Sequence, residues 1–269
     1  MNFPAFNTFA TTHPRQNHLL AAMPDLSWIG WQPYLELLDV SLGKVLCHPG
    51  SATDYVYFPT TAVISLVYTT QDGDSSEIAV VGNDGVVGIS LIMGGNSMPS
   101  QAVVQSAGKV YRLRSQVVKD EVDRGGPALR LLLRYTNSVI SQVTLNAACN
   151  RHHSIDQQLS RRLLVAMDRS ASGELAMTQE LAASLLGVRR EGITNAALKL
   201  QQAGVIRYGR GQISVLNRAG LEKRTCECYA ATKRENERLL PVMSAFRPPT
   251  SSSFPQHSLA ELFTMPVTA

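Results

Sequence analysis

Two adjacent arginines, Arg189 and Arg190, open a stretch that reads as a helix, GVRREGITNAALKL over residues 187–200. The N-terminal end of a helix carries partial positive charge, so cations there are unfavourable unless an anion lies nearby. Arginine can bind O6 and N7 of guanine together, glutamate can accept from N4 of cytosine, and asparagine can bind adenine. Arg190, with Glu191 and Asn195 beside it, therefore indicates a surface that reads base edges.

Further cations near this helix suit contacts with phosphates. Lys199 lies in the same helix, and Arg207 and Arg210 follow in a strand and a Gly-Arg-Gly turn. Such contacts set affinity and register without reading sequence. Residues 177–224 carry eight Lys or Arg and three Glu, an excess of five where the whole chain has +4. A solvated helix face is the alternative explanation, and the order of the surrounding elements argues against it.

That order is helix, short turn with glycine, helix and two strands, which is the order of a winged helix-turn-helix. Thr178 is placed to cap the first helix, TQELAASLLG, and Gly187 and Gly204 end the first and second helices. Residues at helical spacing are expected to face the core: Leu181, Leu185, Leu186, Ile193, Ala197 and Leu200. The exposed N-terminal face of the second helix then consists of Arg190, Glu191, Thr194 and Asn195.

Upstream, residues 126–153 carry a heptad pattern. The members step by four and three residues for nearly three repeats: Leu129, Leu133, Thr136, Ile140, Val143 and Ala147. We interpret the pattern as a dimerisation helix, and the alternative is a helix that lies on its own domain. A second apolar set, Leu132 and Val139, is left to pack against the preceding region.

The region from Gly43 to about Val122 has the residue pattern of strands and turns, not of helices. Short segments rich in Val, Ile, Tyr and Thr alternate with turn signals such as Asp72-Gly73 and Gly94-Gly95-Asn96. This spacing predicts a small antiparallel sandwich or barrel. Such a shape encloses either a cavity or a packed core, and the sequence leaves both open.

The chain thus divides into five predicted parts. They are a flexible arm (1–22), a β-roll (23–125), a dimerisation helix (126–153), a winged helix-turn-helix with a final helix (154–240) and a disordered tail (241–269). Hydrophobic residues make up 44% of the 269 residues, enough for a substantial core. The sequence shows no apolar run near the roughly 20 residues of a membrane span and no signal-peptide pattern, so we expect a cytoplasmic protein.

The four cysteines do not form a recognisable framework. Cys226 and Cys228 are close, as C-x-C, whereas Cys47 and Cys149 stand alone. This is neither a zinc spacing nor a disulfide pattern. We therefore expect reduced thiols and predict no metal site.

The segment MTQELAASLLGVRREGITNAALKLQQAGVIRYGRGQISV resembles the C-terminal helix-turn-helix of the Crp/Fnr family of bacterial transcription regulators. The turn glycine, the Arg-Glu pair and the L-x-x-A-G-V-I exit all match, and the upstream order also matches, so the resemblance covers residues 23 to 240. It implies an α+β fold: a jelly-roll-like antiparallel β-roll, a long dimerisation helix and a winged helix-turn-helix. It also implies a homodimeric regulator that binds a pseudo-palindromic double-stranded DNA, with RNA polymerase as a candidate partner.

The resemblance assigns roles to particular residues. Arg190 and Glu191 match family residues that contact bases, whereas the family's second arginine falls on Asn195, which implies a lost or moved guanine contact. Four more residues fall where family members touch phosphates or approach the DNA backbone: Thr178, Gln179, Arg189 and Gly192.

The β-roll departs from the members that bind cyclic AMP. Those carry G-E-L-A and then R-T-A or R-S-A, in which the acid binds a ribose hydroxyl and the arginine pairs with the phosphate. Here GISL places Ile89 at the acid, and PSQA places Ser100 and Gln101 at the arginine and its neighbour. We therefore predict no tight cyclic AMP binding. A cyclic dinucleotide, another metabolite or no effector at all remain open, so the cofactor is unknown.

Two other kinds of sensor and one other class of protein fit the sequence less well. Family members that sense oxygen through an iron–sulfur cluster need several cysteines near the N-terminus, where this chain has Cys47 alone. Haem ligation by Cys47 or His48 would rest on a single residue. A cupin-like enzyme would need His and Glu ligands converging in the barrel, and the β-region offers His48 and little else. We therefore expect a regulator and not an enzyme.

Overall fold

The computed structural model describes residues 13–169, 177–209 and 212–241. Among these residues no helix is long and apolar enough to cross a membrane. The predicted tail over residues 241–269 lies outside the described residues after residue 241, and so does Arg210.

Part of the segment predicted to be a flexible arm is ordered and buried. Residues Pro14–Gln16 (η1) and His18–Ala21 (α1) are helical, and Leu19 and Leu20 are fully buried in the core of the β-roll. Asn17 caps α1 through its side chain, and its Nδ2 donates to Pro59 O and Gly85 O at 2.8 Å each. The segment looked polar in sequence, but its polar residue satisfies buried backbone groups.

The N-terminal domain is a β-roll of two antiparallel sheets, as predicted. One sheet has the order β1-β7-β3, with strands Glu36–Val40, Gly108–Arg114 and Tyr55–Pro59. The other has the order β2-β6-β4-β5, with strands Val45–Cys47, Gln101–Ser106, Val63–Thr69 and Ser75–Val81. Short helices complete it: α2 (Asp25–Trp31), η2 (Gln32–Tyr34) and η3 (Ile89–Leu91).

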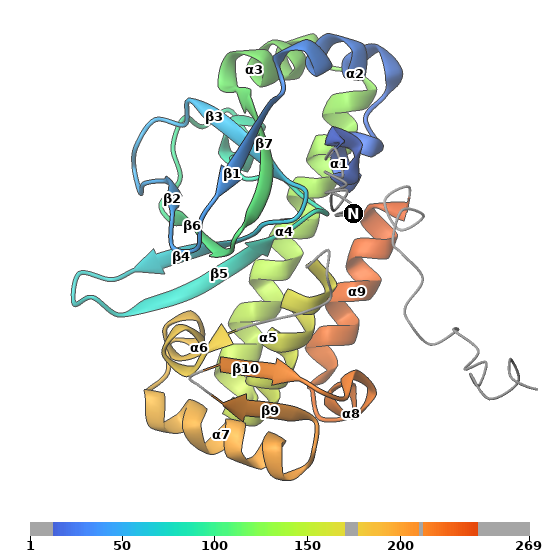
Figure 1. Ribbon diagram of the computed structural model, residues 1–269. Coiled ribbons are helices and arrows are strands. Elements are labelled where there is room, and N and C mark those ends of the chain that lie inside the picture. The colour runs from blue at the N-terminus through green and yellow to red at the C-terminus, as the bar shows by residue number, and fades with distance from the viewer. Residues whose placement is uncertain (1–12, 170–176, 210–211, 242–269) are drawn as a thin grey trace, which may run out of the picture.

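Two helices lead out of the roll. The first is α3 (Ser115–Arg124), and Gly125 and Gly126, with φ of 72° and 93°, turn the chain into α4 (Pro127–His152). Pro127 begins α4, where its missing N–H costs nothing. Leu132 and Val139 lie in the core of the β-roll, which confirms the prediction that they pack against that region. Figure 1 shows α4 running the length of the molecule behind the sheets.

The C-terminal domain is a winged helix-turn-helix. Its helices are α5 (Ile155–Arg169), α6 (Gln179–Leu186), α7 (Arg190–Gln202) and α8 (Arg218–Glu222). Its wing is a three-stranded sheet of order β8-β10-β9, with strands Met177–Thr178, Gln212–Val215 and Ile206–Gly209. Met177, Ile193, Leu200 and Ile213 share one core in this domain.

The final helix differs from its sequence-based expectation. The stretch from Leu221 to Leu240 reads as one charged helix, but the chain turns after α8 and only Glu227–Leu239 forms α9. This helix runs beside α4 (Figure 1), and Leu239 and Leu240 end in the core of the β-roll. The apolar end of α9 therefore belongs to the N-terminal core, although the helix follows the wing in sequence.

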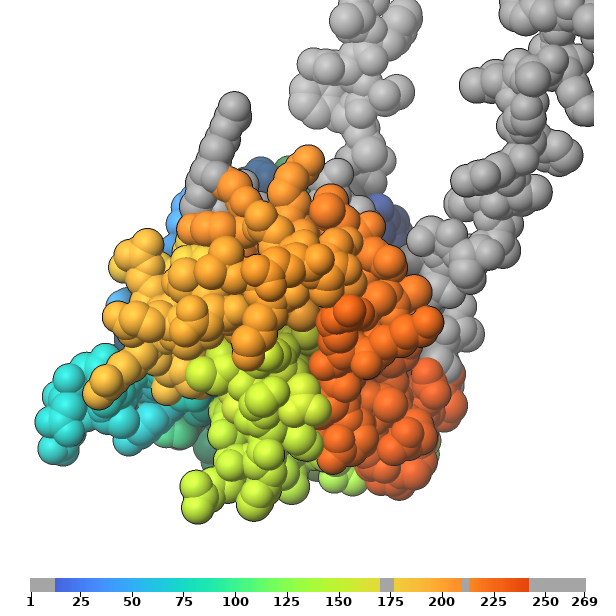
Figure 2. Space-filling model, turned by 90° about the horizontal axis from the view of Figure 1, so that it is seen from below, coloured from blue at the N-terminus to red at the C-terminus, as the bar shows by residue number. Residues whose placement is uncertain are grey.

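Helices from both halves form the underside of the molecule. Figure 2 shows α6 and α7 in yellow and orange, beside the C-terminal part of α4 in yellow-green and α9 in orange-red. The helix with the adjacent arginines thus lies on an outer face of the described structure.

Candidate functional site

The N-terminus of α7 presents the candidate base-reading side chains. Gly187, in the left-handed conformation at φ 64°, ends α6 and turns the chain into α7. Arg189 is the N-cap residue of α7, and its side chain makes no cap hydrogen bond. The core side of α7 is held by Ile193, Ala197 and Leu200, which are 0%, 0% and 2% exposed. This packing confirms the predicted inward face and turns the opposite face outward.

The outward face carries unpartnered charge. Arg189, Arg190, Glu191 and Asn195 are exposed, and so is Arg207 on β9. Within the described residues, the guanidinium groups of Arg189, Arg190 and Arg207 make no hydrogen bond or ion pair. Three cations that form no ion pair among the described residues produce a positive surface, which attracts phosphates.

Two other predicted contact residues are engaged within the protein. Thr178 caps α6 by accepting from Leu181 N at 3.0 Å. Lys199 forms an ion pair with Asp156 on α5, with 2.8 Å between Nζ and Oδ2, although 65% of its side chain is exposed. Both remain predictions as phosphate contacts, because a solvent-exposed ion pair is weak enough to exchange partners.

Gln179 lies differently from a surface contact. It is 5% exposed, and its Oε1 lies 3.0 Å from Oγ1 of Thr194, which is half-buried on α7. Nε2 of Gln179 is buried and has no hydrogen-bond partner among the described residues. The side chain joins α6 to α7 and thereby helps to fix the N-terminal end of α7.

Gly192 allows a close approach between helices. A Cβ at this position would lie 2.7 Å from Cδ1 of Ile155, at the start of α5. Ser154 precedes that helix and caps it, since Gln157 N donates to Ser154 Oγ at 3.4 Å. The glycine therefore has a packing reason in addition to the predicted contact with DNA.

Polar side chains of β5 contact the winged helix-turn-helix. Ser75 and Ser184, on β5 and α6, have hydroxyl oxygens 2.7 Å apart. Two residues further along β5, Glu77 pairs with Arg162 of α5 at 2.6 Å, and both side chains are buried. Burial raises the pKa of Glu77, and the attraction of Arg162 opposes that shift. A movement of β5 would therefore act directly on α5 and α6.

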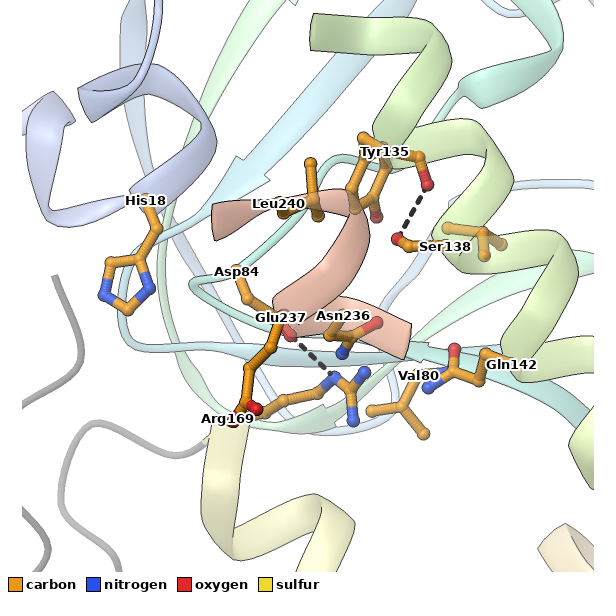
Figure 3. A pocket seen from close by; sticks show the side chains of 11 residues that line it. His18, Val80, Asp84, Tyr135, Ser138, Gln142, Arg169, Asn236, Glu237 and Leu240 are labelled. Atoms are coloured by element: carbon orange, nitrogen blue, oxygen red, sulfur yellow. Dashed lines mark hydrogen bonds and ion pairs between the residues drawn. The ribbon is translucent and has the colours of Figure 1, made fainter. Parts of the chain in front are cut away.

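A third contact lies at the loop after β5. Figure 3 shows a pocket where this loop, α4, α5 and α9 converge. Asp84 pairs there with Arg169, at 3.3 Å between Oδ2 and Nε. The hydroxyl of Tyr135 accepts from Val86 N at 3.0 Å, and burial raises the pKa of Tyr135. Residues of both domains line this pocket, so it lies at the interface between them.

The predicted dimerisation seam is partly exposed on α4. Leu133 and Ile140 are 46% and 53% exposed, and Ala147 is also exposed. Leu129 and Val143 are half-buried. Thr136 differs: it is 3% exposed, and its hydroxyl bonds Leu132 O, so it faces its own chain. The heptad pattern counted Thr136 among the residues of the dimer seam, but its side chain lies on a covered side of α4.

The positions that would bind a cyclic nucleotide are apolar or small. Ile89 packs against the core of the roll together with Leu91, Ile92 and Met98. Ser100 is 5% exposed. Neither side chain supplies the negative or positive charge that a ribose–phosphate ring requires.

Sequence spacing missed one cluster. Cys149 and His153 at the end of α4 meet Cys226 and Cys228 at the start of α9, and their four donor atoms lie within 4.8 Å of one another. The available signals were the i, i+4 spacing of Cys149 and His153 and the C-x-C pair. The hydrogen bond from Cys149 lowers the pKa of Cys226 to about 5, despite burial.

The comparisons with known proteins match both halves of the chain. The family model for the cyclic nucleotide-binding domain matches residues 38–124. The family model for the Crp-like helix-turn-helix domain matches residues 157–224. No curated protein sequence matches the chain significantly.

Solved structures share the fold at low sequence identity. A protein from Eubacterium rectale assigned to the Crp/Fnr regulators has 17% identity and a TM-score of 0.63, over 78% of this chain and 98% of its own. FixK2 from Bradyrhizobium japonicum has 18% identity and a TM-score of 0.60, over 71% and 98%. The c-di-GMP responsive global regulator CLP from Xanthomonas campestris has 12% identity and a TM-score of 0.57, over 71% and 99%.

Proposed function

The chain belongs to the Crp/Fnr family of transcription regulators, and from this premise we propose that it binds a pseudo-palindromic operator as a homodimer and responds to an effector other than cyclic AMP. It is a DNA-binding regulator with a cyclic nucleotide-binding-like domain. The observation that carries the proposal is the exposed, unpartnered Arg189 and Arg190 at the start of α7.

The residues of α7 divide into two roles. Arg190 and Glu191, with Thr194 and Asn195, read base edges from the N-terminal end of the recognition helix. Arg189 binds a phosphate, and Arg207 on the wing binds another. Thr178, Gly192, Lys199 and Arg210 complete the predicted contact surface, and the buried Gln179 supports it through its hydrogen bond with Thr194. The exposed and free guanidinium groups support this division, because a group that binds DNA must be free of protein acids or able to leave them.

The homodimer rests on α4. Leu133, Ile140 and Ala147 form an apolar stripe that the rest of the described chain leaves exposed. Pairing two such stripes in parallel buries them and presents two recognition helices about one helical turn of DNA apart. An operator with two half-sites then follows from the symmetry of the dimer.

The proposal that the effector is not cyclic AMP rests on the side chains that fill the β-roll. Ile89, Leu91 and Met98 pack in its core, and Ser100 stands where an arginine would pair with a cyclic phosphate. We therefore propose that the roll senses a cyclic dinucleotide or another metabolite, and the alternative is a regulator with a filled β-roll that acts without an effector. In the first case, the buried Glu77–Arg162 contact would carry a movement of β5 to α5.

The proposal also has consequences for the class of protein and for its location in the cell. The chain acts through binding and not as an enzyme, since both matched domains are binding domains. Contact with the chromosome and with RNA polymerase would place it in the cytoplasm.

The test is selection of duplexes from a random library by the purified full chain, followed by mobility shifts on the selected sequence and on its own upstream region. We expect an inverted repeat with half-sites about one helical turn apart. Binding that shows no sequence preference at any salt concentration would overturn the proposal.

A further inference from the structure

We propose a metal site where the end of α4 meets the start of α9, which holds one Zn²⁺ through four side chains: Cys149, His153, Cys226 and Cys228. The geometry of these four groups forms the site, which does not depend on DNA binding. It concerns residues that the assigned sensor and recognition helix do not use.

The distances fit a single tetrahedral ion. Cys149 Sγ lies 3.5 Å from Cys226 Sγ, and Cys228 Sγ lies 3.6 Å from His153 Nδ1. In a tetrahedron with zinc–sulfur bonds of about 2.3 Å, neighbouring sulfurs lie about 3.8 Å apart. All four atoms fall within 4.8 Å of one another. One ion at the centre would therefore reach every donor with small side-chain movements.

The backbone holds the four ligands in place. Cys149 and His153 are four residues apart, and His153 N donates to Cys149 O at 3.1 Å, so both face one side of the end of α4. Cys226 is the N-cap residue of α9, and Cys228 lies in its first turn. The positive end of that helix dipole favours thiolates.

His153 also has the outer partner that ligating histidines commonly have. Its Nε2 lies 3.1 Å from Oε1 of Glu227, which leaves Nδ1 directed toward Cys228. A carboxylate that accepts the second N–H fixes the tautomer and orientation of the ring. Glu227 thus acts as a positioning residue for the metal ligand.

The surroundings suit a closed structural site. Cys149, Cys226 and Cys228 are 0%, 3% and 5% exposed, and the His153 side chain is 17% exposed. Three thiolates and one neutral imidazole around Zn²⁺ carry a net charge of −1. Three sulfurs and one nitrogen in a tetrahedron select zinc over oxygen-preferring cations.

The position in the chain suggests what the site does. The segment between His153 and Cys226 contains the whole winged helix-turn-helix. The ion would therefore link the chain just before this domain to the chain just after it. Because the unfolded chain offers no such arrangement, metal binding would stabilise the folded junction.

The experiment uses the full chain, purified under reducing conditions without chelators or a histidine tag. Elemental analysis is expected to find about one zinc per chain, consistent with a four-ligand structural site. The Cys226→Ser/Cys228→Ser variant is expected to retain less than a tenth of that amount. The matched control is Cys47→Ser, which removes the cysteine outside the cluster and should leave the zinc content unchanged.

Three further measurements distinguish metal ligands from residues that only support the fold. Cobalt loaded in place of zinc should show thiolate charge-transfer and tetrahedral ligand-field absorption, and both should weaken in His153→Gln and Cys228→Ser, whose side chains are the least enclosed. Glu227→Gln should still bind one ion, with an affinity about 10–100-fold lower. Removal of zinc should lower Tm by about 5 °C or more.

The proposal is overturned if reduced, folded protein holds less than a tenth of an equivalent of metal and gives no cobalt spectrum. It is also overturned if freshly purified protein has a Cys149–Cys226 disulfide in place of metal, or if the double-serine variant keeps its zinc. Zinc-loaded protein that fails to bind any selected duplex would instead count against the proposed DNA-binding role and would leave the metal site intact.

Discussion

The carboxylate of Glu77 on β5 and the guanidinium of Arg162 on α5 lie 2.6 Å apart, with their side chains 5% and 4% exposed. This ion pair joins the β-roll to the DNA-binding domain in a place that water does not reach. A buried pair costs desolvation energy for both charges, so its partners depend strongly on each other.

A double-mutant cycle measures that dependence. Arg162→Met should lower the free energy of unfolding by about 3–5 kcal/mol at neutral pH, because it leaves a buried carboxylate without a cation. Glu77→Gln should cost less, since its amide oxygen can still accept from Arg162. The double variant should lose less than the sum of the two single losses, because removing the carboxylate together with its cation leaves no unpaired buried charge. Additive losses in urea unfolding would contradict the coupling.

The pH dependence of stability follows from the same pair. Burial raises the pKa of Glu77 above its ordinary value of 4.5, with Arg162 opposing. A raised folded-state pKa contributes stability that is complete below 4.5 and is lost as the pH rises through the folded value. Wild type should therefore lose stability relative to Glu77→Gln as the pH rises from 4 to 8, in unfolding titrations at each pH. The opposite trend would mean that Arg162 outweighs burial.

Substitutions in α7 should separate base reading from phosphate binding. Arg190→Ala and Glu191→Ala should each weaken the selected operator by about 1–3 kcal/mol and relax preference at one base pair per half-site. Arg207→Ala should weaken all sequences alike and reduce the salt slope by about one per subunit. Lys44→Ala changes an exposed cation of the β-roll and serves as the control. Unchanged preference in both helix variants would place the reading surface elsewhere.

Charges introduced on α4 should abolish the dimer. Leu133→Asp with Ile140→Glu places four like charges in the paired stripe, so sedimentation should show a monomer with native helicity. Leu26→Asp alters a more exposed leucine, 87% accessible on α2, and should leave the mass unchanged. A dimer that survives the double substitution would exclude this stripe as the interface.

Cyclic AMP should bind weakly. Calorimetry is expected to show no affinity at micromolar concentration, since Ile89 and Ser100 replace the acid and the arginine. A panel of cyclic dinucleotides in thermal scans would reveal an effector by raising Tm, because a ligand bound to the native state stabilises it by mass action. Micromolar cyclic AMP binding would contradict the assignment of the roll.

Local patterns were sufficient for much of this protein. The spacing of Ile193, Ala197 and Leu200 predicted the buried side of α7, and hence the exposed side that carries Arg190. Such patterns are readable because neighbours in sequence decide which face of a helix is apolar. The same logic located the β-roll and its order before α4.

Tertiary structure decided what lies far apart in sequence. Glu77 and Arg162 are 85 residues apart, and Cys149 and Cys226 are 77 apart, so no local spacing connects them. Gln179 looked like a surface contact in sequence, but α7 packs over it. The seam on α4 was misread at Thr136 because the β-roll and α9 determine which sides of that helix are covered. Periodicity gives an element its apolar face, but only the packed chain determines which elements cover it and which distant side chains meet.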